Sequence, residues 1–292
     1  MHRVLVTGPA AWNLIVHVAD LPAPEPHTLF AQWHHDTLGG TSAGKALNLA
    51  RLGVQVTLLT LVGDDDTGRR ITAELRDHGV DVRAMPSGNG TERHVNLMDT
   101  DGRRLSVYLT LPTPAHEVTV APGLIEDADV VVADLADHAR PVLRAARRAG
   151  KPIWCDLHDY DGVSEFHREF LDAADYLFLS GERLADPEAF LRARAAAGTE
   201  LAVCTQGAQG AIACTRDGSI VRVPATPAGA VVDTNGAGDA FFAGFLAAHL
   251  GGAPLAECLR QASRAGANAV RSRELAAPTL SPALLRAGTP LT

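Results

Sequence analysis

A glycine-punctuated segment near the C-terminus carries the residues with the clearest chemical potential. From Val231 it reads VVDTNGAGDAFFAGF, and an almost wholly apolar run continues to Leu250 before two glycines. Such a run predicts a buried helix, whose first turn has unpaired N–H groups and the positive end of the dipole, a favourable place for an anion. Glycines before the helix let the backbone approach a ligand closely. Asp239 falls in that first turn, beside the expected anion site.

Asp239 has two interpretations on spacing alone. Asp often caps a helix, so the carboxylate can be purely structural. It can also be a general base that takes a proton from a substrate hydroxyl, while nearby N–H groups hold the phosphoryl group being transferred. The spacing by itself leaves both interpretations open.

The segment DTNGAGDAF resembles the C-terminal signature of the ribokinase-like, or PfkB-type, carbohydrate kinases, usually DTTGAGDxF, with Asn235 as the one change. This resemblance implies that Asp239 is the catalytic base and that Gly236, Ala237 and Gly238 form the anion hole. It also implies an enzyme, an ATP-dependent carbohydrate kinase that transfers the γ-phosphate of ATP to a hydroxyl of a small sugar-like substrate. Mg²⁺ would bridge the β- and γ-phosphates.

A second glycine-rich stretch, GGTSAGKALNLARLG from Gly39, nearly spells a Walker A loop. The final position is Ala46, so the hydroxyl that should hold Mg²⁺ is missing, and no strong apolar strand precedes Gly39. The stretch instead resembles the N-terminal signature of the PfkB-type kinases. That resemblance makes Gly39 and Gly40 predicted contacts of the acceptor.

Two departures from the family pattern affect the predicted acceptor site. Gly44 stands where the family usually has an Asn that binds a sugar hydroxyl, and Asn13 stands in place of an Asp. Asn offers one acceptor oxygen and adds a donor, so it can still bind a polyol with different preferences. We keep Asn13, Gly44 and Asp239 as predicted substrate contacts, and the acceptor stays open.

The nucleotide is expected on a third glycine-containing loop. TQGAQGA, from Thr205, resembles the family's Thr-x-Gly-x-x-Gly and implies ATP contacts at Thr205, Gly207 and Gly210. Asn268 lies where the family lines the adenine pocket, although a plain helix surface fits it equally well.

Ion sites are less clearly marked. Asp233 is a candidate for the monovalent-cation (K⁺) loop of several members. Glu182 is a candidate for Mg²⁺ binding through water, or for simple helix capping, because Ser180 replaces the family's Asn. The loop GDDDTG from Gly63 matches another family segment, and its expected role is helix capping.

Composition restricts the remaining classes of function. Apolar residues make up 46%, charged residues 21%, and the net charge of −8 argues against general nucleic-acid binding. No apolar run could span a bilayer and the N-terminus leads straight into a strand, so we expect a cytoplasmic protein without a signal peptide.

The four cysteines show no metal-ligand spacing and are expected to be reduced core thiols. Lys45 and Lys151, the only lysines, are interpreted as a compositional bias without functional content.

Apolar strands that alternate with helices from about residue 118 predict a mainly parallel sheet covered on both faces. The expected fold is a single α/β domain over 1–292, a three-layer α/β/α sandwich. Two extended regions, about 10–36 and 91–111, interrupt the alternation. They include a predicted strand over 29–35 and a hairpin at DTDG, 99–102. The resemblance implies that they form a small β-sheet lid that excludes water from the reaction and often mediates a homodimer.

Three alternatives remain open at this stage. A nucleoside acceptor would need a slot for the base, which Trp12 or Trp33 could supply. A sugar phosphate would need arginines facing the pocket, for which the candidates near the lid hairpin are Arg93, Arg103 and Arg104. The third alternative is a protein that keeps the fold and binds a ligand without catalysis.

Overall fold

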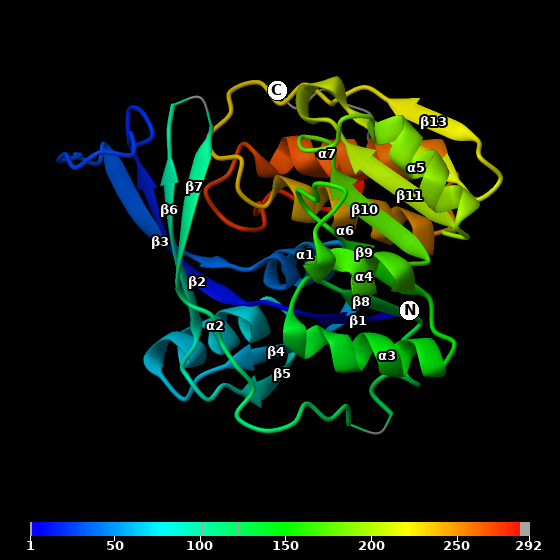
Figure 1. The fold of residues 1–292 in the computed structure, drawn as a ribbon, viewed down its shortest axis with the longest axis horizontal. Helices are drawn as coiled ribbons and strands as arrows, with labels where there is room; N and C mark the ends of the chain where they lie inside the picture. Colours follow the sequence, from blue (N-terminus) through cyan, green and yellow to red (C-terminus); the bar gives the residue numbers. More distant parts are fainter. Residues whose placement is uncertain (1, 101, 122, 287–292) are drawn as a thin grey trace.

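A nine-stranded sheet forms the centre of the molecule (Figure 1), which is seen here in a computed structural model that describes residues 2–100, 102–121 and 123–286. The spatial order is β13-β12-β11-β10-β9-β8-β1-β4-β5. Pairing is parallel from β11 through β5 and antiparallel at β12 and β13. The strands are β1 (Arg3–Thr7), β4 (Gln55–Val62), β5 (Asp81–Pro86), β8 (Val130–Ala133), β9 (Ile153–Asp156), β10 (Tyr176–Ser180), β11 (Leu201–Thr205), β12 (Ala211–Thr215) and β13 (Ile220–Val223).

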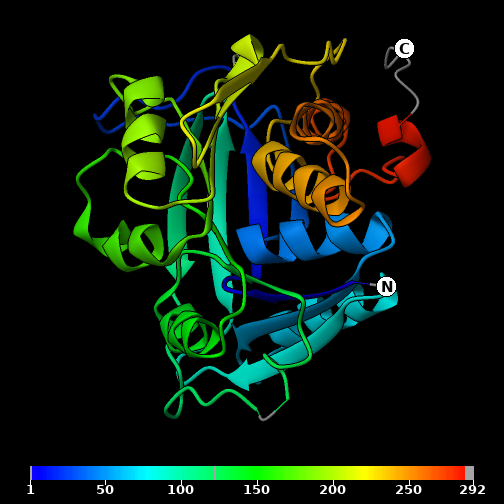
Figure 2. The same cartoon turned by 90° about the vertical axis from the view of Figure 1, so that its right-hand side faces the viewer.

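Helices cover both faces of this sheet (Figure 2). One face packs against α1 (Thr41–Arg51), α2 (Asp66–Asp77), α6 (Ala237–Leu250), α7 (Leu255–Ala269) and α8 (Pro282–Arg286). The other face packs against α3 (Arg140–Arg148), α4 (Arg168–Ala173) and α5 (Pro187–Ala196). Short 3₁₀ turns occur at Asp137–Ala139, Glu165–His167 and Gly207–Gln209. The predicted three-layer α/β/α architecture is confirmed.

The buried strands explain why helices lie on both faces. β8 and β9 are buried along their whole length, so both faces of each strand need a covering layer, and the helices provide it.

The cysteines at 155, 204, 214 and 258 are buried and free, as expected for reduced core thiols. The antiparallel β12–β13 hairpin at one edge was not predicted. None of the helices that the structure describes has the length and hydropathy needed to cross a bilayer.

A separate four-stranded sheet, ordered β3-β2-β6-β7, projects from the body (Figure 1). Its strands are β2 (Ala11–His17), β3 (Trp33–Gly39), β6 (Glu92–Met98) and β7 (Arg104–Thr110). β2 and β6 pair in parallel, and the outer pairs are antiparallel. Both predicted lid regions contribute to this sheet, and we call it the lid.

The third lid strand differs from its prediction. It was expected over 29–35 but begins at Trp33 and continues to Gly39, because its partner β2 fixes the register from His17↔Trp33 to Ala11↔Gly39. β3 therefore runs directly into Gly39, although its residues are mostly polar. The predicted hairpin joins β6 to β7, with the Gly102 N–H donating to the Asp99 carbonyl at 3.1 Å; Asp101 lies outside the described residues.

Candidate active site

Helix α6 begins at Ala237, three residues before the continuous apolar run that starts at Ala240. Gly236 caps it in the left-handed conformation, with φ 74°, and a Cβ there would lie 2.9 Å from the Leu275 carbonyl oxygen. Only glycine fits this position without strain. The sharp turn leaves the first-turn N–H groups of α6 at the end of the loop, and Asp239 stands among them, as predicted.

Asp239 is buried, with 7% of the residue exposed. Its Oδ1 accepts a hydrogen bond from Lys45 Nζ at 2.9 Å. Among the residues that the structure describes, its Oδ2 has no hydrogen-bond partner. Burial raises the pKa of the carboxyl to about 6, against the opposing effects of Lys45 and His158. A carboxyl with a pKa near neutrality is suited to proton transfer at physiological pH.

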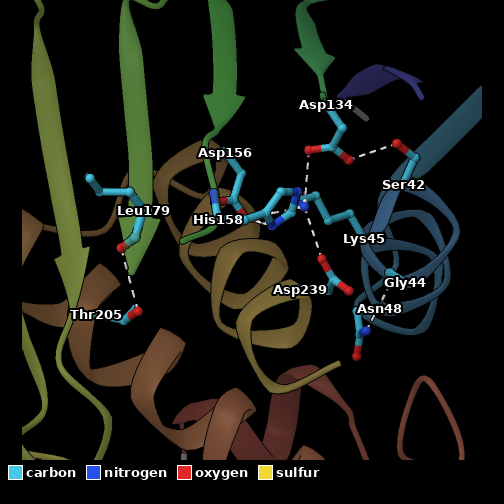
Figure 3. Close-up of polar contacts among 10 residues, drawn as sticks. All are labelled: Ser42, Gly44, Lys45, Asn48, Asp134, Asp156, His158, Leu179, Thr205 and Asp239. Atoms are coloured by element: carbon cyan, nitrogen blue, oxygen red, sulfur yellow. Dashed lines mark hydrogen bonds and ion pairs between the residues drawn. The ribbon is translucent and has the colours of Figure 1, made fainter. Parts of the chain in front are cut away.

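Lys45 lies at the centre of a group of three carboxylates (Figure 3). Its side chain is fully buried on α1, and Nζ lies 3.0 Å from Asp134 Oδ1, 3.2 Å from Asp156 Oδ2 and 2.9 Å from Asp239 Oδ1. Burial opposes the charged form of Lys45, but the three carboxylates raise its pKa well above the ordinary value. We call these four residues the lysine–carboxylate cluster.

The central sheet positions two members of this cluster. Asp134 follows β8 and Asp156 ends β9, so both project from the carboxyl ends of adjacent parallel strands. Strand β1 neighbours both β4 and β8, which places the cluster beside the point where the strand order reverses. Open parallel sheets bind ligands at such a switch point. The Ser42 hydroxyl donates to Asp134 Oδ2 at 2.7 Å and fixes that carboxylate against α1.

His158 approaches the cluster through an unusual backbone conformation. Its φ of 51° is the only positive value among the described non-glycine residues. The bend is held because the Asp156 carboxylate accepts the His158 N–H at 3.0 Å, and the His158 carbonyl accepts the Ser180 N–H at 2.6 Å. Its Nδ1 lies 3.7 Å from Asp156 Oδ2. Strained backbone of this kind is frequent at functional sites.

Apart from Asp239, the residues predicted to bind the acceptor lie in the lid strands β2 and β3 and at the start of α1, which follows them. A Cβ on Gly39 would lie 2.2 Å from the Asn13 side chain, and one on Gly40, with φ 89°, would lie 2.5 Å from the Pro9 carbonyl. A Cβ on Gly44 would lie 2.6 Å from Asp239 Oδ2. Asn13 is buried, with no hydrogen-bond partner for Oδ1 among the described residues. The fold thus brings Gly44 against Asp239 and Gly39 against Asn13.

The predicted nucleotide residues occupy varied environments. Thr205 ends β11, and Gly207 follows it with φ 54°. Gly210 has a structural reason to be glycine, because an added Cβ would lie 2.1 Å from the Val223 carbonyl oxygen. Asn268 is buried on α7, where Oδ1 accepts the Thr279 hydroxyl at 2.9 Å and Nδ2 has no partner among the described residues.

The predicted ion ligands do not converge. Asp233 is buried and its Oδ1 accepts the Asn235 N–H at 2.8 Å, an arrangement that shapes the loop before α6. Glu182 is exposed. Within the described ranges, no group of three or more His, Cys, Asp or Glu side chains is arranged to hold a metal ion. The GDDDTG loop caps α2 as expected, since Asp65 accepts the Gly68 N–H at 2.7 Å.

A mainly parallel sheet, a small lid and a carboxylate at a glycine-capped helix N-terminus define a class of phosphotransferase. The sequence profile of the "pfkB family carbohydrate kinase" matches residues 1–282, so this chain belongs to that family. An acarbose 7(IV)-phosphotransferase from Actinoplanes sp. is 35% identical over 280 residues, 91% of each chain. An ATP-dependent ribose-1-phosphate kinase from Halopiger xanaduensis is 31% identical, over 96% of each chain.

Solved structures agree with this assignment. The microbiome-derived acarbose kinase Mak1 has a TM-score of 0.80 and 33% identity, over 93% of each chain. A putative ribokinase from Agrobacterium tumefaciens has a TM-score of 0.81 and 25% identity, over 96% of this chain and 95% of the other. The protein is therefore an ATP-dependent kinase of sugar-like substrates, and the expected family, fold and enzyme class are confirmed.

The sequence interpretation missed most of the lysine–carboxylate cluster. Lys45 was interpreted as part of a compositional bias without functional content, whereas the structure buries it fully against three carboxylates. Asp134 and Asp156 were not singled out, although Asp134 directly follows one short buried strand and Asp156 is the last residue of another. The carboxyl ends of adjacent parallel strands are places where functional side chains meet, so that position was the available signal.

Proposed function

We propose that Asp239 is the general base of phosphoryl transfer and that the N–H groups of Gly236, Ala237 and Gly238 stabilise the phosphoryl group while it is transferred. The observation that carries this proposal is the geometry of Asp239. It stands in the first turn of α6 with Oδ1 held by Lys45 and Oδ2 left for a proton. A hydroxyl that donates to Oδ2 would lose its proton as its oxygen attacks the γ-phosphate at the helix N-terminus.

Nucleotide and ions follow from the same arrangement. We place ATP against Thr205, Gly207, Gly210 and Asn268, and give Mg²⁺ its usual task of neutralising charge on the β- and γ-phosphates. Glu182 is exposed, so a water-mediated role in metal binding would depend on bound nucleotide. A K⁺ site at Asp233 is the least supported of these proposals, because one carboxylate oxygen already accepts the Asn235 N–H and the neighbouring Val270 carbonyl accepts two further N–H groups.

We propose an uncharged sugar or glycoside as the acceptor. The nucleoside alternative required a free aromatic face on Trp12 or Trp33, and both rings are already packed. The Arg70 guanidinium lies 4.0 Å from the Trp12 ring centroid. His17 stacks on Trp33 with ring centroids 3.5 Å apart, and Arg273 lies 4.3 Å from the same ring.

The sugar-phosphate alternative required arginines directed at the site. Arg93 is exposed at the start of β6, where the pairing with β7 shifts by one residue. Arg103 contacts the Asp99 carboxylate at 2.6 Å. Arg104 alone reaches the loop before α6, where it donates to Asn235 Oδ1 at 3.3 Å. One arginine at this distance gives limited support for a phosphorylated acceptor.

The first experiment measures ADP release from MgATP against free sugars, sugar acids, glycosides including acarbose, nucleosides and sugar phosphates. The Asp239→Asn variant should lose about 10²–10⁴-fold in turnover, the usual contribution of a general base. Asp66→Asn is the matched control, because Asp66 also lies in the first turn of a helix but has a fully exposed side chain. Activity confined to nucleosides or sugar phosphates would overturn the acceptor assignment.

Undiminished turnover of Asp239→Asn would overturn the proposed mechanism. ATP binding without ADP release from any acceptor would favour the remaining alternative, a member of the fold that binds ligand without catalysis.

We also propose that the chain forms a homodimer through the lid. β7 is an edge strand whose side chains at 105, 107 and 109 are apolar and exposed by 43%, 46% and 54%. Leu105 and Val107 lie two residues apart and share one face of the strand, whereas the pairing with β6 shifts by one residue after Tyr108, so Leu109 has no residue opposite it. An exposed apolar edge of this kind is a ready surface for a second copy.

A further inference from the structure

The lysine–carboxylate cluster contains more charge than the transfer reaction requires. Of the two lysines in the chain, Lys45 is fully buried, whereas Lys151 lies elsewhere and donates to the carbonyls of Glu126 and Ala128. Removing an ammonium group from water is costly unless partners compensate it. Three carboxylates do so here, from the ends of β8 and β9 and from the start of α6. Such an arrangement needs a functional reason, because an apolar side chain would fill the same space at lower cost.

The two oxygens of Asp239 have different environments because of Lys45. Oδ1 is held at 2.9 Å from Nζ, while Oδ2 lies over the backbone of Gly44, where an added Cβ would be only 2.6 Å away. Lys45 therefore fixes the rotation of the carboxylate and leaves one defined oxygen accessible. The absence of a side chain at Gly44 provides the space that this oxygen occupies.

The other carboxylates hold Lys45 in place. Asp134 is bound both to Lys45 and to the Ser42 hydroxyl, and a Cβ on Gly8 would lie 2.3 Å from Ser42 Oγ and 2.9 Å from Asp134 Cβ, so the contact leaves little room for movement. Asp156 approaches Nζ at 3.2 Å from the carboxyl end of the neighbouring strand β9. The ammonium group cannot leave Asp239 without losing these contacts.

We propose that Lys45 is a positioning residue for the catalytic base, holding the Asp239 carboxylate in one orientation and in its charged form, and that Asp134 and Asp156 hold the lysine. This inference rests on the proposed role of Asp239. Lys45 contacts neither phosphate nor acceptor in this scheme, which separates it from the lysine of a P-loop. It lies inside α1, and its charge is satisfied by protein carboxylates.

The groups that face Asp239 shift its titration in opposite directions. Lys45 and His158 lower the pKa of Asp239, whereas burial and the charge of Asp134 raise it, with a net value of about 6. Asp156 faces the same ammonium group, and Lys45 contributes to holding its pKa below the usual range despite burial. Removing the lysine should therefore raise the pKa of the base, and removing the Asp134 charge should lower it.

The test is the pH dependence of kcat/KM for wild type, Lys45→Met and Asp134→Asn with the same MgATP and acceptor, so that titration of the substrates cancels. Transfer requires ionised Asp239, so the rate should fall on the acid side near pH 6 in the wild type. The acid limb should move to higher pH in Lys45→Met and to lower pH in Asp134→Asn. If the pKa of Asp239 shifts by one unit, the rate at pH 5, taken relative to each variant's own plateau rate, differs from that of the wild type by about fivefold to tenfold.

Lys151→Met is the matched control, since it removes the chain's other lysine without touching the cluster, and its profile should overlay that of the wild type. Shifts of the same sign in both cluster variants, or no shift in either, would overturn the proposal. Asp239→Asn keeps the two proposals distinguishable: if that variant is inactive and the profiles do not move, Asp239 is the base and Lys45 does not tune it.

A second measurement needs no cluster variant and covers the case in which Lys45→Met fails to fold. Reductive methylation with ¹³C-formaldehyde would label accessible amines, and the chain offers two lysines and its N-terminus. Lys151 should react in the native protein and Lys45 only after unfolding. With uniform labelling, the Lys45 ¹³Cε signal should show no titration across pH 6–10, because its pKa is held well above the ordinary value. Native-state labelling of Lys45, or its titration in that range, would contradict the proposal.

Discussion

Neighbouring residues at the site limit the positions that each side chain can take. Gly44 illustrates this, because it replaces the Asn expected from the family pattern and its missing side chain makes room for Asp239 Oδ2. An Asn at this position would clash with the Asp239 carboxylate in its observed position, so one of the two groups would have to move. The departure from the family pattern and the position of the base are therefore linked.

Replacing Gly44 with Ala tests that link. Gly44 is helical, so Ala should favour α1 by up to about 1 kcal/mol on propensity. The added Cβ would also push the Asp239 carboxylate from its place beside Lys45, which should lower kcat by about 10–100-fold, the range expected for a misplaced catalytic group. Thermal unfolding and steady-state kinetics measure the two effects separately. A melting temperature that falls in step with activity would instead indicate general damage.

Among the elements, α2 and the lid are joined through one capping residue. Asp65 accepts the Gly68 N–H at 2.7 Å at the start of α2, and it also accepts the Thr91 N–H at 2.9 Å and the Thr91 hydroxyl at 2.7 Å just before β6. Burial acts against ionisation, but these hydrogen bonds lower the pKa of Asp65 below its ordinary value. The stabilisation is therefore fully present at neutral pH and is lost as pH falls through that lowered pKa.

Removing this carboxylate should loosen both elements. Asp65→Ala loses a helix cap and leaves two donors of Thr91 without their acceptor, at a cost of about 1–3 kcal/mol. For a chain of this size the melting temperature should fall by about 2–10 °C at pH 7. The neighbouring Asp64→Ala is the control, since Asp64 is fully exposed and its carboxylate pairs with the exposed Arg69. Equal effects of the two variants would contradict the special role of Asp65.

At the scale of the whole molecule, the exposed face of β7 predicts self-association. Substituting Val107 and Leu109 together with Lys should abolish the proposed dimer, because two like-charged rows cannot pack at a dry interface. Sedimentation velocity of the wild type and this variant measures the change, with Val163→Lys as a control at an exposed apolar position, 75% accessible, outside the lid. A wild-type chain that sediments as a monomer at all concentrations would refute the lid interface.

The sequence alone indicated the family and the alternation of strands and helices, and it singled out Asp239 as the candidate base. It could do so because these features depend on local chemistry: apolar runs of four or more residues, glycines at required turns, and an acid in a helix first turn. The lid hairpin followed from the same local patterns.

Only the tertiary structure decided what surrounds Asp239. Lys45 and Asp239 are 194 residues apart in the sequence, Asp134 and Asp156 lie between them, and no local pattern links the four residues. They meet because α1 packs against α6, and because β8 and β9 end side by side in a sheet whose order follows long-range pairing. The start of β3 was likewise set by its partner β2 rather than by its own sequence. The pairing of a buried ammonium group with carboxylates is a property of that assembly, so a lysine that was interpreted as compositional bias lies at the centre of the lysine–carboxylate cluster.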